Sequence, residues 1–317
     1  MGVVKRGLRV GLETTWTLGK IIFPITLIVT ILGHTPALDW IARMLAPVMG
    51  WIGLPGEAAI PLVLGNILNL YAGIGAILTM DLTVKEVFIL AVMLSFSHNL
   101  LVESAVAAKV GVRMSVILAV RIGLALISAF VINLFWQGGQ EMAQYGFVSA
   151  AQQPELNSWL AIGWDGVTSA ALGIFQLALI VIPLMVVIQV MKERNWIKIM
   201  SKAMRPLTKL LRVQENTSTT LVSGLTIGLA FGAGVIIQAA KEDGISKKDM
   251  YLIVIFLVAC HAVVEDTLIF IPLGIPVWPL LIIRILTAIL LTLAISVIWD
   301  RVEKKQKLER KETSYEY

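Results

Sequence analysis

The chain has 317 residues, of which 57% are hydrophobic and only 15% are charged, and its mean hydropathy is +0.84. Because soluble domains carry about 25% charged residues, this composition excludes a water-soluble globular protein and predicts an all-α membrane protein with several spans. The net charge of +5 does not indicate nucleic acid as a partner. The basic residues lie next to apolar segments, where they orient the chain and contact anionic membrane lipid. The single cysteine, Cys260, excludes an internal disulfide and a cysteine-only metal cage.

The apolar segments form two sets of four, separated by a polar stretch. They lie near residues 14–33, 57–79, 87–108 and 114–136, and then near 166–191, 217–240, 250–271 and 280–299. The first follows a basic start without a small-residue cleavage site, which predicts an uncleaved helix. In each set a tryptophan-bearing stretch, 36–54 or 195–213, follows the first segment and is typical of a helix lying along the membrane surface.

The two sets are copies of one pattern. With an offset of 159, and then of 163 after a four-residue insertion, matching residues coincide. The matched pairs are Pro24 and Pro183, Pro47 and Pro206, Gly65 and Gly224, Gly73 and Gly232, Gly75 and Gly234, His98 and His261, Glu103 and Asp266, Gly111 and Gly274, and Arg121 and Arg284. Such a repeat in apolar sequence is typical of transporters built from two related halves.

The distribution of Lys and Arg selects the topology. If all eight segments crossed the membrane, the Lys and Arg residues of the loops and termini would divide into 13 on the inner side and 10 on the outer side. If 57–79 and 217–240 are re-entrant hairpins, 21 lie inside and 2 outside, which the positive-inside rule strongly favours. Making 87–108 and 250–271 the hairpins gives 19 to 4, so the choice of hairpin stays open. Three crossings per half would invert the second repeat relative to the first.

We therefore predict two inverted repeats, each with about three transmembrane helices, one re-entrant hairpin and an interfacial helix. The first repeat spans 1–136, an external linker spans 137–161, the second repeat spans 162–300, and 301–317 is a charged, disordered cytoplasmic tail. The expected location is the plasma membrane, with several passes and both termini cytoplasmic. A homo-oligomer is compatible with this architecture.

The proposed hairpins place small and polar residues in mid-segment. Asn66, Asn69 and Tyr71 fall near the first tip, and Ser223, Thr226 and Gly228 near the second. Irregular backbone at membrane depth needs protein or a wet cavity around it, so these groups are candidates for binding a polar solute. Two alternatives stay open: the polar groups only cap broken helices, and the glycines only let ordinary helices pack closely.

Buried charge inside the last two apolar segments of each half needs partners. Glu103 and Arg121 each lie nine residues from the centre of the 109–115 turn, and Asp266 and Arg284 straddle the 274–276 turn similarly. In an antiparallel helix pair, both members then lie at one depth, about 13 Å from the turn. They are expected to form structural ion pairs, with substrate or ion binding by the acids as the alternative.

Other polar groups in these segments are candidate site residues. His98 and Asn99 interrupt 87–108, whereas His261 and Glu265 interrupt 250–271. Glu265 has no acidic counterpart in the first half, and in a continuous helix it would share a face with His261. That pair is expected to couple transport to a proton or cation, and two histidines with two carboxylates could also ligate a divalent metal. No His-Glu-x-x-His pattern supports a metalloenzyme, and no organic cofactor is indicated.

With its glycine-rich hairpins and the segments SHNLLVES and ACHAVVEDT, the chain resembles the nucleoside-recognition or gate domain family. That family is related to the core of concentrative nucleoside transporters, the membrane part of ferrous-iron transporters and the spore maturation membrane proteins. The resemblance implies alternating access, with a site between hairpin tips and interrupted helices. The Gln-Thr-Glu cluster of nucleoside transporters and a cysteine-based iron motif are both missing here, so the substrate does not carry over.

The expected function is a secondary-type membrane transporter for a small polar solute, nucleoside-like or another organic solute, and not an enzyme. Divalent metal transport is one alternative. A non-transporting membrane component of a spore-maturation-type assembly is another.

Overall fold

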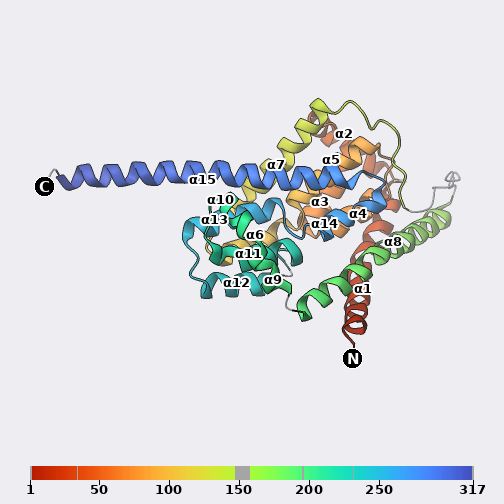
Figure 1. Ribbon diagram of the computed structural model, residues 1–317. Helices are drawn as coiled ribbons and strands as arrows, with labels where there is room; N and C mark the ends of the chain where they lie inside the picture. The colour runs from red at the N-terminus through yellow and green to blue at the C-terminus, as the bar shows by residue number, and fades with distance from the viewer. Residues whose placement is uncertain (1, 34, 147–157, 195, 231, 316–317) are drawn as a thin grey trace.

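The computed structural model describes residues 2–33, 35–146, 158–194, 196–230 and 232–315. Over these residues the chain is helical, and it contains no strand beyond an isolated bridge between Thr83 and Met142. The all-α membrane fold expected from composition is confirmed. Figure 1 shows a bundle of short helices, with α1 and α8 crossing on one side and α15 reaching far out on the other.

The two halves share one order of elements. The first half contains α1 (Val3–Gly33), α2 (Pro36–Trp51), η1 (Gly56–Ala58), α3 (Ala59–Ile67), α4 (Leu70–Ile77), α5 (Val84–Ser97), α6 (Leu100–Lys109) and α7 (Met114–Phe135). The second half contains α8 (Trp159–Glu193), α9 (Trp196–Ala203), α10 (Arg205–Leu211), η2 (Glu215–Thr217), α11 (Ser218–Ile227), α12 (Ala233–Glu242), α13 (Lys247–Ala259), α14 (Glu265–Leu268), η3 (Ile271–Leu273) and α15 (Val277–Tyr315). Each half therefore has a long helix, a segment of one or two shorter helices, a pair of short helices, an interrupted helix and a closing helix.

The long first helices of the two halves, α1 and α8, pack against each other (Figure 1). A Cβ on Gly7 would lie 2.7 Å from Val186 Cα, and one on Gly11 would lie 2.9 Å from Ile182 Cα. Because the residue numbers of the contacts fall along α8 as they rise along α1, the two helices run antiparallel. The absence of side chains at these glycines lets the helices approach this closely.

The short helices α3 and α4 fold back on each other at residues 68–69. A Cβ on Gly73 would lie 2.9 Å from the Pro61 carbonyl oxygen and 3.2 Å from Gly65 Cα. Glycine at both positions therefore permits the close antiparallel contact. The helices α11 and α12 form the corresponding pair in the second half. Helix α11 is followed by Gly228, whose φ of 87° favours glycine.

Helices α5 and α13 lie in the core between the closing helices of both halves. Helix α5 packs on α7 and α15, whereas α13 packs on α15 and α7. Nearly every residue of both helices is buried. This explains why their sequences are apolar all round, since neither helix has a face left for solvent or lipid.

Five helical stretches of the described chain are long and apolar enough to cross a membrane. They are residues 3–32, 84–109, 114–135, 159–191 and 277–306, with a sixth if the bent pair 43–51 and 56–67 is one span. The expected span 250–271 is not among them. The chain leaves helical geometry for five residues after Ala259, so α13 is only 13 residues long.

Other expectations need correction. The tail 301–315 is not disordered but continues α15 to Tyr315, because its Glu, Lys, Gln and Arg residues are good helix formers. The stretch expected to be one interfacial helix in the second half is divided into α9 and α10.

The described part of the linker packs on the helical core. Residues 139–143 form hydrogen bonds with the main chain around the start of α5, and the Gly146 amide donates to the Pro272 carbonyl oxygen at 2.7 Å. Residues 147–157 of the linker lie outside the described residues.

Candidate functional site

A cavity of about 300 Å³ lies where the two halves meet. Its wall combines the turn of the first hairpin, the end of the second and the interruptions that follow α5 and α13. The lining residues are Thr17, Leu68, Asn69, Leu70, Tyr71, His98, Asn99, Glu103, Ile227, Gly228, Leu229, Ala230, His261, Ala262, Glu265 and Asp266. Both interruptions therefore expose polar side chains and main chain to one shared cavity.

The interruptions are held open by equivalent bonds to the hairpins. Asn99 has a φ of 50°, and its amide donates to the Gly65 carbonyl oxygen at 2.8 Å. Ala262, its repeat counterpart, has a φ of 39°, and its amide donates to the Gly224 carbonyl oxygen at 2.9 Å. Left-handed backbone is tolerated by Asn but strained for Ala, and such strain gathers at functional sites.

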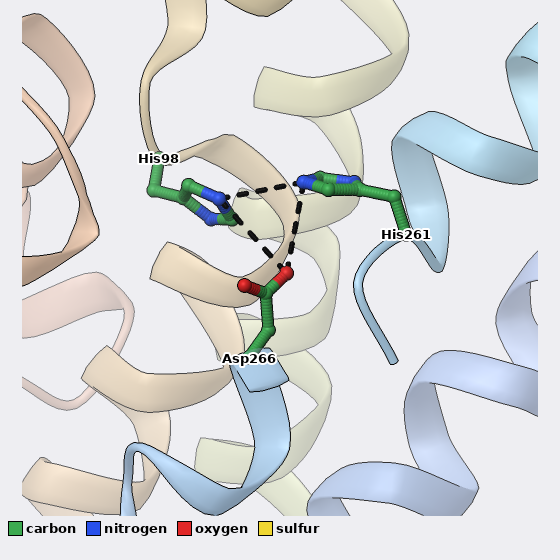
Figure 2. A group of neighbouring side chains, drawn as sticks. All are labelled: His98, His261 and Asp266. Carbon is green, nitrogen blue, oxygen red and sulfur yellow. Dashed lines mark hydrogen bonds and ion pairs between the residues drawn. The ribbon is translucent and has the colours of Figure 1, made fainter. Parts of the chain in front are cut away.

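The two histidines face each other across the junction. His98 Nδ1 lies 2.7 Å from the Leu94 carbonyl oxygen, and His261 Nδ1 lies 2.9 Å from that of Leu257. The two Nε2 atoms are 3.4 Å apart. Figure 2 shows both rings directed at the carboxylate of Asp266. Both side chains are almost fully buried.

Each half also contains the expected pair of acid and arginine. Arg121 Nη2 lies 2.8 Å from Glu103 Oε2, and Arg284 Nη2 lies 3.0 Å from Asp266 Oδ2. All four residues are buried, and both arginines are fully so. Each guanidinium offsets the cost of burying a carboxylate, so loss of either partner would strand a charge.

The arginines also bind the interruptions themselves. Arg121 Nε donates to the Phe96 carbonyl oxygen at 2.8 Å, and its Nη2 donates to that of His98. Arg284 Nη2 donates to the His261 carbonyl oxygen at 2.7 Å. These carbonyl groups have lost helical partners where the helices end, so each arginine caps a broken helix as well as pairing with an acid.

Contacts across the halves complete the cluster. His261 Nε2 lies 3.2 Å from Glu103 Oε2 and 3.6 Å from Asp266 Oδ2. His98 Nε2 lies 3.5 Å from Glu103 Oε1 and 4.0 Å from Asp266 Oδ2. Each histidine therefore faces acids from both halves. The Tyr71 hydroxyl donates to Glu265 Oε1 at 2.7 Å, which adds a further link between the halves.

The structure brings together six of the nine expected substrate-binding residues. Asn69, Tyr71, His98, Asn99, His261 and Glu265 line the cavity.

Three expected binding residues do not line it. The Thr226 hydroxyl donates to the Val222 carbonyl oxygen within α11, and Asn66 Nδ2 donates to that of Leu62 within α3. Ser223 is buried in α11. Asn69 has both roles considered from sequence, because it lines the cavity and its side chain also caps α4 through the Ala72 amide.

The expected pairing of His261 with Glu265 is wrong. It assumed a continuous helix, but the chain between Ala259 and Glu265 is not helical. His261 instead faces Glu103 and Asp266, and Glu265 accepts a hydrogen bond from Tyr71.

Sequence reasoning missed Thr17 as part of the wall, whereas Gly228, a candidate near the second tip, does line the cavity. Thr17 gave no signal because it follows a basic N-terminal stretch. The glycine at 228, which stands at the repeat position of Asn69, was the usable signal for exposed backbone.

Comparison with known proteins agrees with this geometry. The Gate family, described as nucleoside recognition, matches the chain twice, over residues 15–114 and 174–276. The chain belongs to this family. Each match contains one hairpin and one of the two facing histidines, whereas the arginines Arg121 and Arg284 lie beyond the matched regions.

The chain is also similar to the uncharacterized membrane protein YvoD of Bacillus subtilis (strain 168). The two are 64% identical over 295 residues, covering 93% of this chain and 94% of the relative. No solved structure matches the chain.

Proposed function

We propose that this chain is a secondary-type transporter that moves a small polar solute across the plasma membrane by alternating access. The observation that carries the proposal is the cavity between the halves, whose wall is made of hairpin ends and broken helices. In transporters built from repeats, discontinuous helices at the repeat interface form the solute site. The membership of the Gate family supports the same reading.

The lining indicates the class of solute. A volume of about 300 Å³ is at the small end of ligand pockets. Asn69, Tyr71 and Asn99 supply polar side chains, while residues 227–230 supply main-chain groups. The solute is therefore small and rich in hydrogen-bonding groups, such as a nucleoside or a comparable organic molecule.

The arrangement of the halves supports a rocking mechanism. The equivalent helices α1 and α8 run antiparallel, as inverted repeats require. The excess of Lys and Arg on one side of the proposed topology supports a cytoplasmic location of both termini. In this proposal, movement of one half against the other exposes the cavity to each side in turn, and a proton or cation bound at the histidine pair is the coupling species.

Two alternatives differ in what they move. The pairing of His98 and His261 with acids favours a divalent metal ion as the alternative cargo, since imidazole and carboxylate are metal ligands. A membrane component of a spore-maturation-type assembly would move nothing, and solute exchange distinguishes it from a transporter.

The test begins with a ligand screen. Purified protein is heated with nucleosides, organic anions or divalent metals, and a ligand at 100 times its dissociation constant adds about 2.7 kcal/mol to the free energy of unfolding. Stabilising compounds are then radiolabelled and offered to proteoliposomes.

The variant Asn99→Gly removes a cavity side chain and keeps the left-handed backbone accessible. It should lower uptake at limiting solute by about tenfold, as expected for one lost hydrogen bond. Thr226→Val is the matched control, because that hydroxyl bonds within its own helix outside the cavity, and its uptake should stay at the wild-type level. If folded wild-type protein exchanges no compound, the transport proposal is rejected.

A further inference from the structure

The atoms that meet between the two histidines are all hydrogen-bond acceptors. Each Nδ1 faces a carbonyl oxygen, which can only accept, so each Nδ1 carries the ring hydrogen. In the neutral ring Nε2 then presents a lone pair. His98 Nε2 and His261 Nε2 face each other and the carboxylate oxygens of Glu103 and Asp266. Arg121 and Arg284 offset the charges of the two carboxylates from behind, and a cation between the four groups would bind the lone pairs that face one another.

The distances identify the kind of cation. The two Nε2 atoms and Asp266 Oδ2 form a triangle with edges of 3.4, 3.6 and 4.0 Å. A triangle with these edges has a point about 2.1 Å from all three corners, which is the length of zinc bonds to histidine nitrogen and carboxylate oxygen. We propose that His98, His261 and Asp266, together with Glu103, bind one divalent transition-metal ion in the wall of the cavity.

Glu103 is placed to supply the fourth ligand. Its Oε2 lies 3.2 Å from His261 Nε2, and its Oε1 lies 3.5 Å from His98 Nε2. The side chain is 4% exposed, and Oε2 is also paired with Arg121 Nη2 at 2.8 Å. A carboxylate has about four lone-pair sites on its two oxygens, so this ion pair leaves lone pairs that can bind a cation.

The groups behind the ligands are those that support metal sites. Metal-binding histidines usually donate their other ring N–H to a backbone carbonyl or carboxylate, which fixes the tautomer and the orientation of the ring. Both Nδ1 atoms do so here, to Leu94 and Leu257. Arg121 and Arg284 hold the carboxylates of the remaining ligands in place.

The donor set selects among metals. Two imidazoles and two carboxylates suit Zn²⁺, Fe²⁺, Co²⁺ or Mn²⁺, whereas Mg²⁺ and Ca²⁺ prefer oxygen ligands alone. The charges agree with a cation. Three carboxylates line the cavity, those of Glu103, Glu265 and Asp266, and two arginines lie behind them, so the described groups carry one net negative charge.

This inference rests on the proposed function only for its consequence in transport, where the ion would lie beside the solute. Metal binding is measured on the purified chain without any transport assay. A protein that binds metal and moves no solute would therefore reject transport alone, and a transporter without metal would reject this inference alone.

The direct test is a metal titration of the full-length chain. Protein in detergent is stripped of metal with a chelator, dialysed and titrated with Co²⁺. A second stripped sample is incubated with Zn²⁺ and dialysed, and the Zn²⁺ that stays bound is counted by mass spectrometry of the metal. One ion per chain and the intense visible bands of four-coordinate Co²⁺ are expected, with no competition from excess Mg²⁺. Absence of bound Zn²⁺ and of those bands in folded wild-type protein overturns the proposal and leaves a proton as the cation.

Variants then test the ligands. His98→Gln and His261→Gln should each weaken Zn²⁺ binding at least about 100-fold, because even outer-shell changes cost about 10–100-fold. His34→Gln, which removes the remaining histidine of the chain, should bind Zn²⁺ like the wild type. Wild-type affinity in both ligand variants overturns the assignment. If either fails to fold, as judged by gel filtration and circular dichroism, the wild-type Co²⁺ spectrum decides.

Discussion

Tyr71 and Glu265 are 194 positions apart in the chain, yet the Tyr71 hydroxyl donates a 2.7 Å hydrogen bond to Glu265 Oε1. Tyr71 lies at the start of α4 in the first hairpin, and Glu265 begins α14 in the second half. Both side chains are buried and line the cavity. The bond therefore ties a hairpin of one half to the interrupted helix of the other at the cavity.

Loss of this bond should destabilise the protein. Tyr71→Phe removes a donor to a carboxylate, and such bonds contribute about 1.5–3 kcal/mol. We expect a fall of that size in the free energy of unfolding, measured by denaturation in detergent. Glu265→Gln, the control, keeps an acceptor for the hydroxyl and should cost less. Equal stability of Tyr71→Phe and wild type would show that the bond contributes nothing.

Arg121→Ala should lower the free energy of unfolding by about 3–5 kcal/mol, because it strands the buried carboxylate of Glu103. The double change Arg121→Leu with Glu103→Leu should recover part of this loss. Recovery should be incomplete, since Arg121 also binds the carbonyl groups of Phe96 and His98. Denaturation of metal-free protein compares the wild type, Arg121→Ala, the double leucine variant and the two single leucine variants. Additive effects of the two single leucine changes would argue against the pairing.

Substitution by alanine should affect stability differently at two glycines of the first hairpin, α3 and α4. In Gly73→Ala the new methyl group would lie 2.9 Å from the Pro61 carbonyl oxygen, a main-chain atom that cannot turn away. In Gly65→Ala it would meet the end of the Leu94 side chain, which can rotate. Overpacking costs about 1–3 kcal/mol, so Gly73→Ala should be clearly less stable than Gly65→Ala in thermal unfolding. The reverse order would contradict the close approach of α3 and α4.

The proposed inverted topology predicts that two introduced cysteines are labelled from opposite sides of the membrane. Cys260 is the only native cysteine, so Cys260→Ala provides a clean background. Ser149→Cys should react with an impermeant maleimide added to intact cells, and Lys198→Cys should react only after the membrane is opened. Labelling of both positions from one side would reject the inversion.

The sequence by itself determined the membrane class, the repeat and both ion pairs. These features can be read from the sequence without knowledge of the packing. An apolar composition indicates a chain that lies in lipid, and the rise per residue of a helix places Glu103 and Arg121 at the same distance from their turn. The histidines were found in the same way, since His98 and His261 recur at matching positions in apolar sequence.

Only the tertiary structure decided how these groups meet. Periodicity does not show at which residue a buried helix breaks, so the sequence wrongly placed His261 and Glu265 on one helical face, whereas the helix ends at Ala259. The facing of the two Nε2 atoms and the bond from Tyr71 depend on how one half packs on the other. Such contacts between distant segments are set by the packing of whole helices, whereas sequence pattern reports only the faces that each helix buries.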